Sequence, residues 1–82
     1  MNINFNGIHI EKDGNLAPTI MIFGDTILIK FSKSAMLIQV EKEGRVNLSV
    51  LVGDTCTYYT YTDVESANKV LGVHFSTAGM GQ

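Results

Sequence analysis

The sequence predicts a mainly β (α+β) fold: an antiparallel up-and-down meander of six to seven strands, curled or barrel-like, with one C-terminal helix packed on the sheet. Apolar and polar residues alternate over most of the 82 residues, a period of two that is typical of strands with one buried face. Short glycine-containing turn signals separate these runs. Residues 62–72 change to the spacing of a helix.

The clearest stretch is residues 36–52, where apolar residues occupy even positions in two arms around Lys42-Glu43-Gly44. These three residues suit a hairpin loop with the glycine in the left-handed conformation. Folding the arms back pairs Glu41 with Arg45 and brings each apolar residue opposite another. We therefore predict a hairpin here.

Near the N-terminus, Asn6-Gly7 lies between two alternating runs within residues 1–11. Asn-Gly in this setting is a strong hairpin signal, and it would pair Phe5 with Ile8. A bulge in one longer strand is the competing interpretation.

The next turn signal is Lys12-Asp13-Gly14, followed by a predicted strand over residues 16–23. Pro18 cannot donate a ladder hydrogen bond, so it indicates an edge strand or a bulge. Gly24-Asp25 turns the chain into a strand over residues 26–31, and Gly53-Asp54 leads into a strand over residues 55–62.

Two pairs of turn segments resemble each other and suggest an internal repeat. Residues 10–14 resemble residues 40–44, and residues 24–26 resemble residues 53–55, at an offset of about 30 residues. A duplicated three-strand unit would explain both matches. The alternative is that hairpin turns draw on few residue types.

The helix is predicted from Thr62-Asp63-Val64-Glu65, which matches a capping box. An apolar stripe of Val64, Ala67 and Leu71 follows at helical spacing. Gly72 suits the C-terminal cap, which gives about ten helical residues. Residues 73–75 are expected to return as a short strand, and residues 76–82 to be a flexible tail. We expect residues 1–82 to form a single domain.

Alternation divides the sheet into two faces. The core face is predicted to hold Ile20, Ile22, Ile27, Ile29, Phe31, Met36, Ile38, Val40, Val46, Leu48, Val50, Tyr59 and Tyr61. The other face also carries apolar residues, namely Met21, Phe23, Leu28, Leu37, Leu51, Cys56 and Tyr58. They are buried at the seam of a barrel, scattered over the surface, or part of a contact surface for another subunit or protein.

Composition limits the possible functions. Eight acidic and six scattered basic residues give a net charge of −2, so we expect no nucleic-acid binding. No apolar run approaches the length of a membrane span, and we expect no membrane partner. A single cysteine excludes a disulfide within the chain and fits a reducing compartment, so we expect a cytoplasmic location.

The titratable residues form no recognisable catalytic group. His9 and His74 lie far apart, and Cys56 has no basic neighbour in sequence that would lower its pKa. Asp25 and Asp54 each follow a turn glycine, where aspartate is a common structural residue. Paired turns would offer both carboxylates to a cation at one end of the sheet, but the sequence holds no series of oxygen ligands. We expect no enzyme activity, catalytic residue, metal or cofactor.

The function expected from these observations is protein binding through the sheet surface or an edge strand. A homo-oligomer, with a dimer favoured, or another protein partner would cover it. The interface candidates are Met21, Phe23, Leu28, Leu37, Leu51 and Tyr58. An inhibitor that occludes a larger target, such as those that viruses direct at host defence, is one form of this expectation. The alternatives are a small-molecule-binding protein or small enzyme, with a pocket formed by Tyr59, Tyr61, Asp63 and His74, and a structural subunit of a larger assembly.

Overall fold

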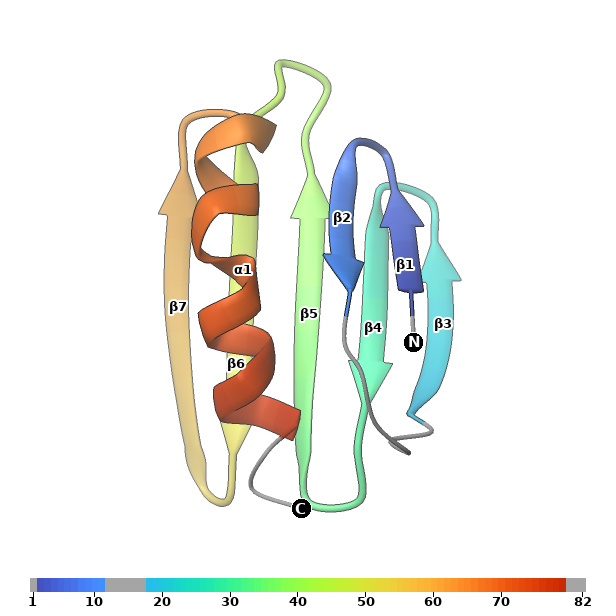
Figure 1. Cartoon of the computed structure of the whole chain (residues 1–82), viewed down its shortest axis with the longest axis vertical. Helices are drawn as coiled ribbons and strands as arrows, with labels where there is room; N and C mark the ends of the chain where they lie inside the picture. Colours follow the sequence, from blue (N-terminus) through green and yellow to red (C-terminus); the bar gives the residue numbers. More distant parts are fainter. Residues whose placement is uncertain (1, 12–17, 80–82) are drawn as a thin grey trace.

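A computed structural model describes residues 2–11 and 18–79 of the chain (Figure 1). The elements in chain order are β1 (Asn2–Phe5), β2 (Ile8–Glu11), β3 (Thr19–Phe23), β4 (Thr26–Lys30), β5 (Ser34–Val40), β6 (Val46–Val52), β7 (Thr55–Tyr61) and α1 (Val64–Gly79). The mainly β class with a C-terminal helix is confirmed. The described residues contain no helix with the length and apolar content to cross a membrane.

The strands form two antiparallel sheets rather than one continuous meander. Strands β3 to β7 make a five-stranded sheet in sequence order, whereas β1 and β2 pair only with each other. The five-stranded sheet does not close into a barrel, because β3 and β7 are its two open edges. The barrel form of the prediction is therefore wrong for this sheet, and no barrel seam exists to bury its second apolar face.

The hairpin predictions hold in detail. Asn6 and Gly7 both have positive φ angles, 48° and 89°, as a type I′ turn requires, and Phe5 pairs with Ile8. The Glu41 amide donates to the Arg45 carbonyl at 2.8 Å, which closes the predicted three-residue loop between β5 and β6. Both pairings are the ones expected from the sequence.

One face of the five-stranded sheet is covered by two elements that lie side by side. Figure 1 shows α1 in front of β6 and the β1–β2 hairpin in front of β4. Asn68 of α1 joins the two covers, since its Nδ2 donates to the Gly7 carbonyl at 2.8 Å and its Oδ1 accepts from the His9 amide at 3.0 Å. The hairpin lies over the sheet because its four apolar side chains share one face and are buried there. Those side chains are Ile3, Phe5, Ile8 and Ile10.

The core lies between the five-stranded sheet and these two covers. Eight of the predicted core residues are buried: Ile27, Ile29, Phe31, Met36, Ile38, Val46, Leu48 and Val50. Val40 and Tyr61 pack partly buried against them. Ile20, Ile22 and Tyr59 were also predicted to be core residues, but they are exposed, Ile22 by 61%. They lie on the edge strands β3 and β7, where the helix and the hairpin do not bury them.

Helix α1 differs from the prediction at both ends. Asp63 caps it instead of Thr62, because the Ser66 amide donates to Asp63 Oδ1 at 2.7 Å. The helix continues through Gly72 and the expected 73–75 strand as far as Gly79. Phe75, four residues after Leu71, extends the apolar stripe by one more turn and is 1% exposed. This burial favours a longer helix over a strand. Residues 76–79 of the predicted tail are helical, and residues 80–82 lie outside the described part.

The suggested repeat extends only to turn geometry. Gly24 and Gly53 have φ angles of 59° and 60°, and each begins a two-residue turn between paired strands. The first strands of the two suggested units differ in position, since β2 pairs with β1 in its own sheet and β5 is the centre of the larger one. The first turn of the repeat, Lys12-Asp13-Gly14, lies outside the described residues.

Candidate functional site

The outer face of the five-stranded sheet, turned away from α1 and the hairpin, carries the predicted interface residues. The strand register arranges its side chains in rows across the sheet. The first row begins with Phe23 on β3 and continues as the polar row of Thr26, Gln39, Asn47 and Thr60. The central row consists of Met21, Leu28, Leu37, Ser49 and Tyr58. The third row consists of Thr19, Lys30, Ala35, Leu51 and Cys56.

The polar row is held by its own hydrogen bonds. Gln39 Nε2 donates to Asp25 Oδ2 at 3.1 Å, and Asn47 Nδ2 donates to Gln39 Oε1 at 3.0 Å. Thr60 Oγ1 donates to Asn47 Oδ1 at 3.3 Å, which carries the chain of bonds to β7. Because these side chains bind one another, this row is a structural element of the outer face.

The two other rows form a shallow apolar hollow of about 370 Å³. It is lined by Leu28, Ala35, Leu37, Ser49, Leu51, Cys56 and Tyr58. Four of the six predicted interface residues therefore share one concave surface. Met21 and Phe23 are exposed on β3, on the same face but outside the hollow. Leu51 is 42% exposed and Tyr58 75%.

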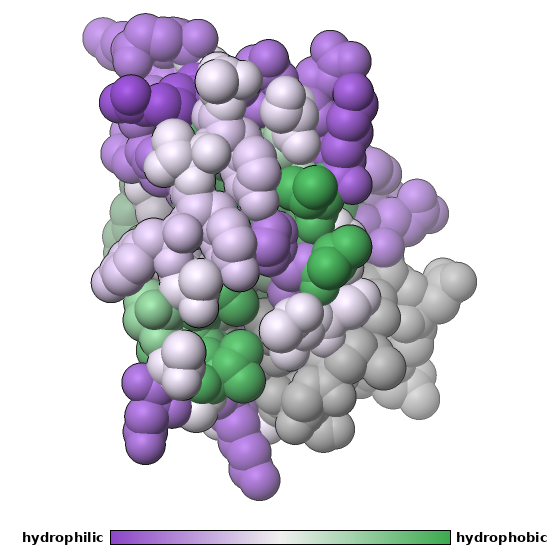
Figure 2. Space-filling view, turned by 90° about the vertical axis from the view of Figure 1, so that its left-hand side faces the viewer, coloured by the Kyte–Doolittle hydropathy of each residue, from purple (hydrophilic) through white to green (hydrophobic). Residues whose placement is uncertain are grey.

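The open edge strand β7 borders this hollow. Its seven residues, TCTYYTY, include no charged residue and no proline, and six of the seven are exposed. Figure 2 faces this edge and shows a pale band of side chains with apolar ones on both sides, while the most hydrophilic side chains gather mainly at the two ends. Natural proteins commonly protect such edges with charges, proline or bulges. The β7 edge carries neither a charge nor a proline.

Tyr58 and Cys56 are neighbours on the outer side of β7. The Cys56 thiol is the main cause that raises the pKa of the Tyr58 hydroxyl. A tyrosine hydroxyl is uncharged near neutral pH even at its ordinary pKa of about 10, so the β7 end of the hollow presents a neutral aromatic side chain. An apolar or aromatic contact suits this position better than an ionic one.

The residues of the alternative pocket come together only in part. His74 Nε2 lies 2.7 Å from the Tyr61 hydroxyl, and its ring lies 4.2 Å from that of Tyr59 between centroids. Burial lowers the pKa of His74 and raises that of Tyr61. Asp63 is engaged at the helix N-terminus instead.

The space under α1 is filled by the helix itself. Ala67, Leu71 and Phe75 point toward the sheet and are at most 1% exposed. The Phe75 ring meets the Phe31 ring edge to face at 5.4 Å between centroids. Because the helix fills this space, His74, Tyr59 and Tyr61 contact one another at the rim of the core.

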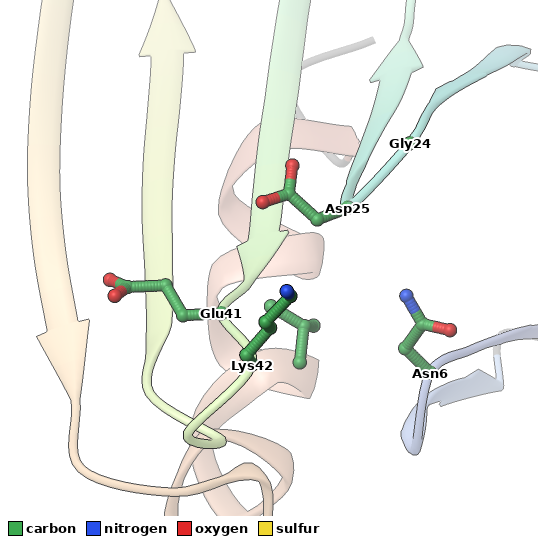
Figure 3. A pocket seen from close by; sticks show the side chains of 6 residues that line it. Asn6, Gly24, Asp25, Glu41 and Lys42 are labelled. Atoms are coloured by element: carbon green, nitrogen blue, oxygen red, sulfur yellow. The ribbon is translucent and has the colours of Figure 1, made fainter.

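A second hollow of about 420 Å³ lies at one end of the sheet, where three hairpins meet (Figure 3). Asn6, Asp25 and Lys42 surround it, and Figure 3 shows the Glu41 carboxylate turned away from Asn6. Arg45 binds both Glu41 oxygens, at 2.7 and 2.9 Å, and this pairing lowers the pKa of Glu41 to about 2. The carboxylates of Asp25 and Glu41 are thus already hydrogen-bonded within the chain.

The cation site considered for Asp25 and Asp54 does not form. Asp25 lies in the β3–β4 turn and Asp54 in the β6–β7 turn, which are at opposite ends of the antiparallel sheet. Within residues 2–11 and 18–79, no group of three or more histidine, cysteine, aspartate or glutamate side chains is placed to hold a metal ion. His9 contacts Asn4 and Glu11 on the hairpin, in a different element from His74.

Several surface residues were not singled out by the sequence. Ala35 and Ser49 complete the hollow, and Val73 is 67% exposed on α1. The sequence predicts the meander order of β3 to β7 but not that this sheet stays open, and alternation assigns a residue to a face without showing which strands are edges. The chain matches no known family model, no curated protein and no solved structure.

Proposed function

We propose that this chain is a small non-enzymatic protein-interaction module that binds through the outer face of its sheet and the open edge of β7. The observation that carries the proposal is the apolar hollow, which reaches the uncharged edge strand. A large contiguous apolar patch that is exposed on a monomer often marks an interaction site.

The composition of this surface fits a protein partner. Tyr58 is a large exposed aromatic residue at the rim, and leucines form the floor. Such a combination, an aromatic anchor beside an apolar depression, is typical of the central part of protein interfaces. The polar row on one side supplies amide and hydroxyl groups for the rim.

Occlusion of a larger target is the mode of action that fits this surface best. A rigid sheet face blocks a partner by covering it and needs no reactive group. An inhibitor of the kind that viruses direct at host defence is one such module. The alternative of a small-molecule pocket between sheet and helix has less support, because Leu71 and Phe75 fill that space. A structural subunit of a larger assembly would use the same outer face.

The test is capture of partners from lysate of the source cells with the wild type and three variants. Leu51→Glu and Phe23→Glu place a charge on the outer face, whereas Gly72→Glu places the same charge on exposed helix surface with open space around it. Proteins identified by mass spectrometry should be retained by the wild type and Gly72→Glu, and lost by Leu51→Glu and Phe23→Glu. Equal recovery with all the variants, each shown to be folded by circular dichroism, would contradict the proposal.

A further inference from the structure

We propose that the edge strand β7 pairs with β7 of a second copy of this chain, antiparallel and centred on Tyr58, to form a two-fold symmetric dimer. This inference rests on the proposed function and deepens it, since it names one partner of the same surface. Among the described strands, β7 lies at the end of its sheet and pairs only with β6.

The turn before β7 determines which residues face the open edge. Gly53 has a φ of 60° and Asp54 a negative φ, as in a type II′ turn, and Val52 pairs with Thr55 across it. A two-residue turn is closed by a hydrogen-bonded pair, and in an antiparallel ladder hydrogen-bonded residues alternate along the strand. Every second residue from Thr55 onward therefore bonds to β6.

The residues in between direct their N–H and C=O groups away from the sheet. These are Cys56, Tyr58 and Thr60, the outer-face residues of β7. Tyr58 is the midpoint of the three and of the whole strand. A two-fold axis at Tyr58 pairs it with its own copy and pairs Cys56 with Thr60 of the second copy. All three residues then exchange hydrogen bonds across the axis.

The side chains in this register are compatible with one another. Thr57 lies opposite Tyr59 and Thr55 opposite Tyr61 of the second copy, and pairs of β-branched and aromatic residues stabilise antiparallel strands. No pair brings like charges together, because the strand is uncharged. A sequence that pairs with itself in this way favours a closed dimer over a chain of copies.

The helix flank extends the contact on the inner face. Asn68 faces the hairpin, and Val73, five residues later, lies about 140° further round the helix, on the opposite flank. Val73 is 67% exposed. Because α1 lies in front of β6 (Figure 1), two copies of the helix would be about three strand spacings, or ~14 Å, apart. This leaves room for the Tyr59 side chains between them.

The size of the contact predicts a reversible dimer. The edge of a seven-residue strand is about 23 Å long and ~10 Å thick, so the paired edges bury on the order of 500 Å² in total. Specific stable interfaces bury roughly 1,000 Å² or more. Tyr58 and the helix flanks must supply the remainder, and we expect the mass to depend on concentration.

The other edge strand, β3, offers fewer backbone groups for pairing with a second copy. By the same alternation from the Gly24-Asp25 turn, only Ile20 and Ile22 of β3 direct their backbone groups outward. A β3 pair would thus form two hydrogen-bonded pairs where β7 forms three. Pairing of β7 with β3 of another copy would be heterologous and would continue into a filament.

The first experiment is light scattering after size exclusion over a range of protein concentrations. The proposal expects a dimer whose dissociation constant rises about tenfold or more in Tyr58→Lys, which places two like charges on the axis. Met21→Lys, a matched change on the β3 edge, should leave the dimer intact. Circular dichroism checks that both variants are folded. A dimer lost only in Met21→Lys, or a filament, overturns the proposal.

The register is tested by cross-linking through Cys56. In the Thr60→Cys variant the predicted register brings Cys56 opposite the introduced cysteine of the second copy, with Cα atoms about 5.5 Å apart, within the range of disulfides. Mild oxidation should give a covalent dimer, whereas Thr60→Cys combined with Cys56→Ser should remain uncross-linked. A monomer at every concentration with no cross-link overturns self-pairing. It leaves the proposed function standing if partner capture still depends on Leu51.

Discussion

At the scale of single residues, His74 links the packing of α1 to pH. Its Nε2 accepts a hydrogen bond from the Tyr61 hydroxyl at 2.7 Å when the ring proton is on Nδ1. Burial lowers the pKa of His74 below its usual 6.5. The ring is therefore neutral in the folded protein at pH values where the unfolded chain already binds a proton.

This difference predicts that stability falls as the pH is lowered through about 6.5 and is fully present above it. Glu41, whose pKa is lowered from 4.5 to about 2 in the folded protein, adds to this decline only toward the acidic end of the range from about pH 5 to 8, where the unfolded chain begins to bind a proton at this carboxyl. Urea midpoints measured across this range should decline toward low pH in the wild type. They should decline less in His74→Gln, which has no ring to protonate.

Tyr61→Phe serves as the companion variant. It removes the hydroxyl and should cost about 0.5 kcal/mol at mildly alkaline pH, because the bond is partly exposed and lies at the weak end of the usual range. If the wild type and His74→Gln show the same slope, His74 is not the group that titrates.

At the scale of elements, helix α1 contains Gly72 at a position where its backbone conformation does not require glycine. Gly72 lies within the helix, and a Cβ at this position meets nothing within 4 Å. Its φ is not positive. Glycine costs ~0.5–1 kcal/mol relative to alanine inside a helix, because it loses more conformational freedom on folding.

Gly72→Ala should therefore raise the free energy of unfolding by about 0.5–1 kcal/mol in a urea titration. Gly7→Ala is the contrasting change. Gly7 has a φ of 89°, and its Cβ would lie 3.1 Å from Val64, so this variant should be destabilised. A loss of stability in Gly72→Ala would mean that the helix does not continue through this residue.

Gly72 is also the reason why the sequence-based prediction ends α1 too early. Gly72 after Leu71 has the pattern of a C-terminal cap, and only the burial of Phe75 shows that one more turn is stabilised by the core. The sequence predicts the β5–β6 hairpin with its register, and the β1–β2 hairpin as one of two interpretations, because turn residues and alternation act locally. Whether the sheet closes and which part of it is covered depend on contacts distant in sequence, and these decide that Ile22 and Tyr59 are exposed at edges.

At the scale of the whole molecule, the sequence alone predicts part of the candidate interface. Alternation placed Leu28, Leu37, Leu51 and Tyr58 on one face, and the register brings them into one hollow. The role of β7 as an edge was not predictable, because nothing in its composition distinguishes an edge from a central strand. The sequence does not predict that the β1–β2 hairpin forms its own sheet, since the pairing of the hairpin is local but its position over the larger sheet is not.

That position makes the hairpin and the sheet one cooperative unit. A two-stranded hairpin is at best marginally stable alone in water, and here all four of its inward side chains are buried in the core. Ile8, at 1% exposure, also lies next to the turn that Asn68 of α1 holds in place. The hairpin should therefore not unfold separately from the rest of the molecule.

Ile8→Ala should lower the free energy of unfolding by about 2–5 kcal/mol, the range for truncating a fully buried isoleucine. Tyrosine fluorescence reports on β7 and far-ultraviolet circular dichroism on the backbone as a whole. Both should give the same, lower denaturant midpoint in a single transition. His9→Ala, on the exposed side of the same strand, is the control and should shift the midpoint much less. Two separate transitions in Ile8→Ala, with the β7 signal unchanged, would show instead that the hairpin is an independent cover that can leave the sheet without unfolding it.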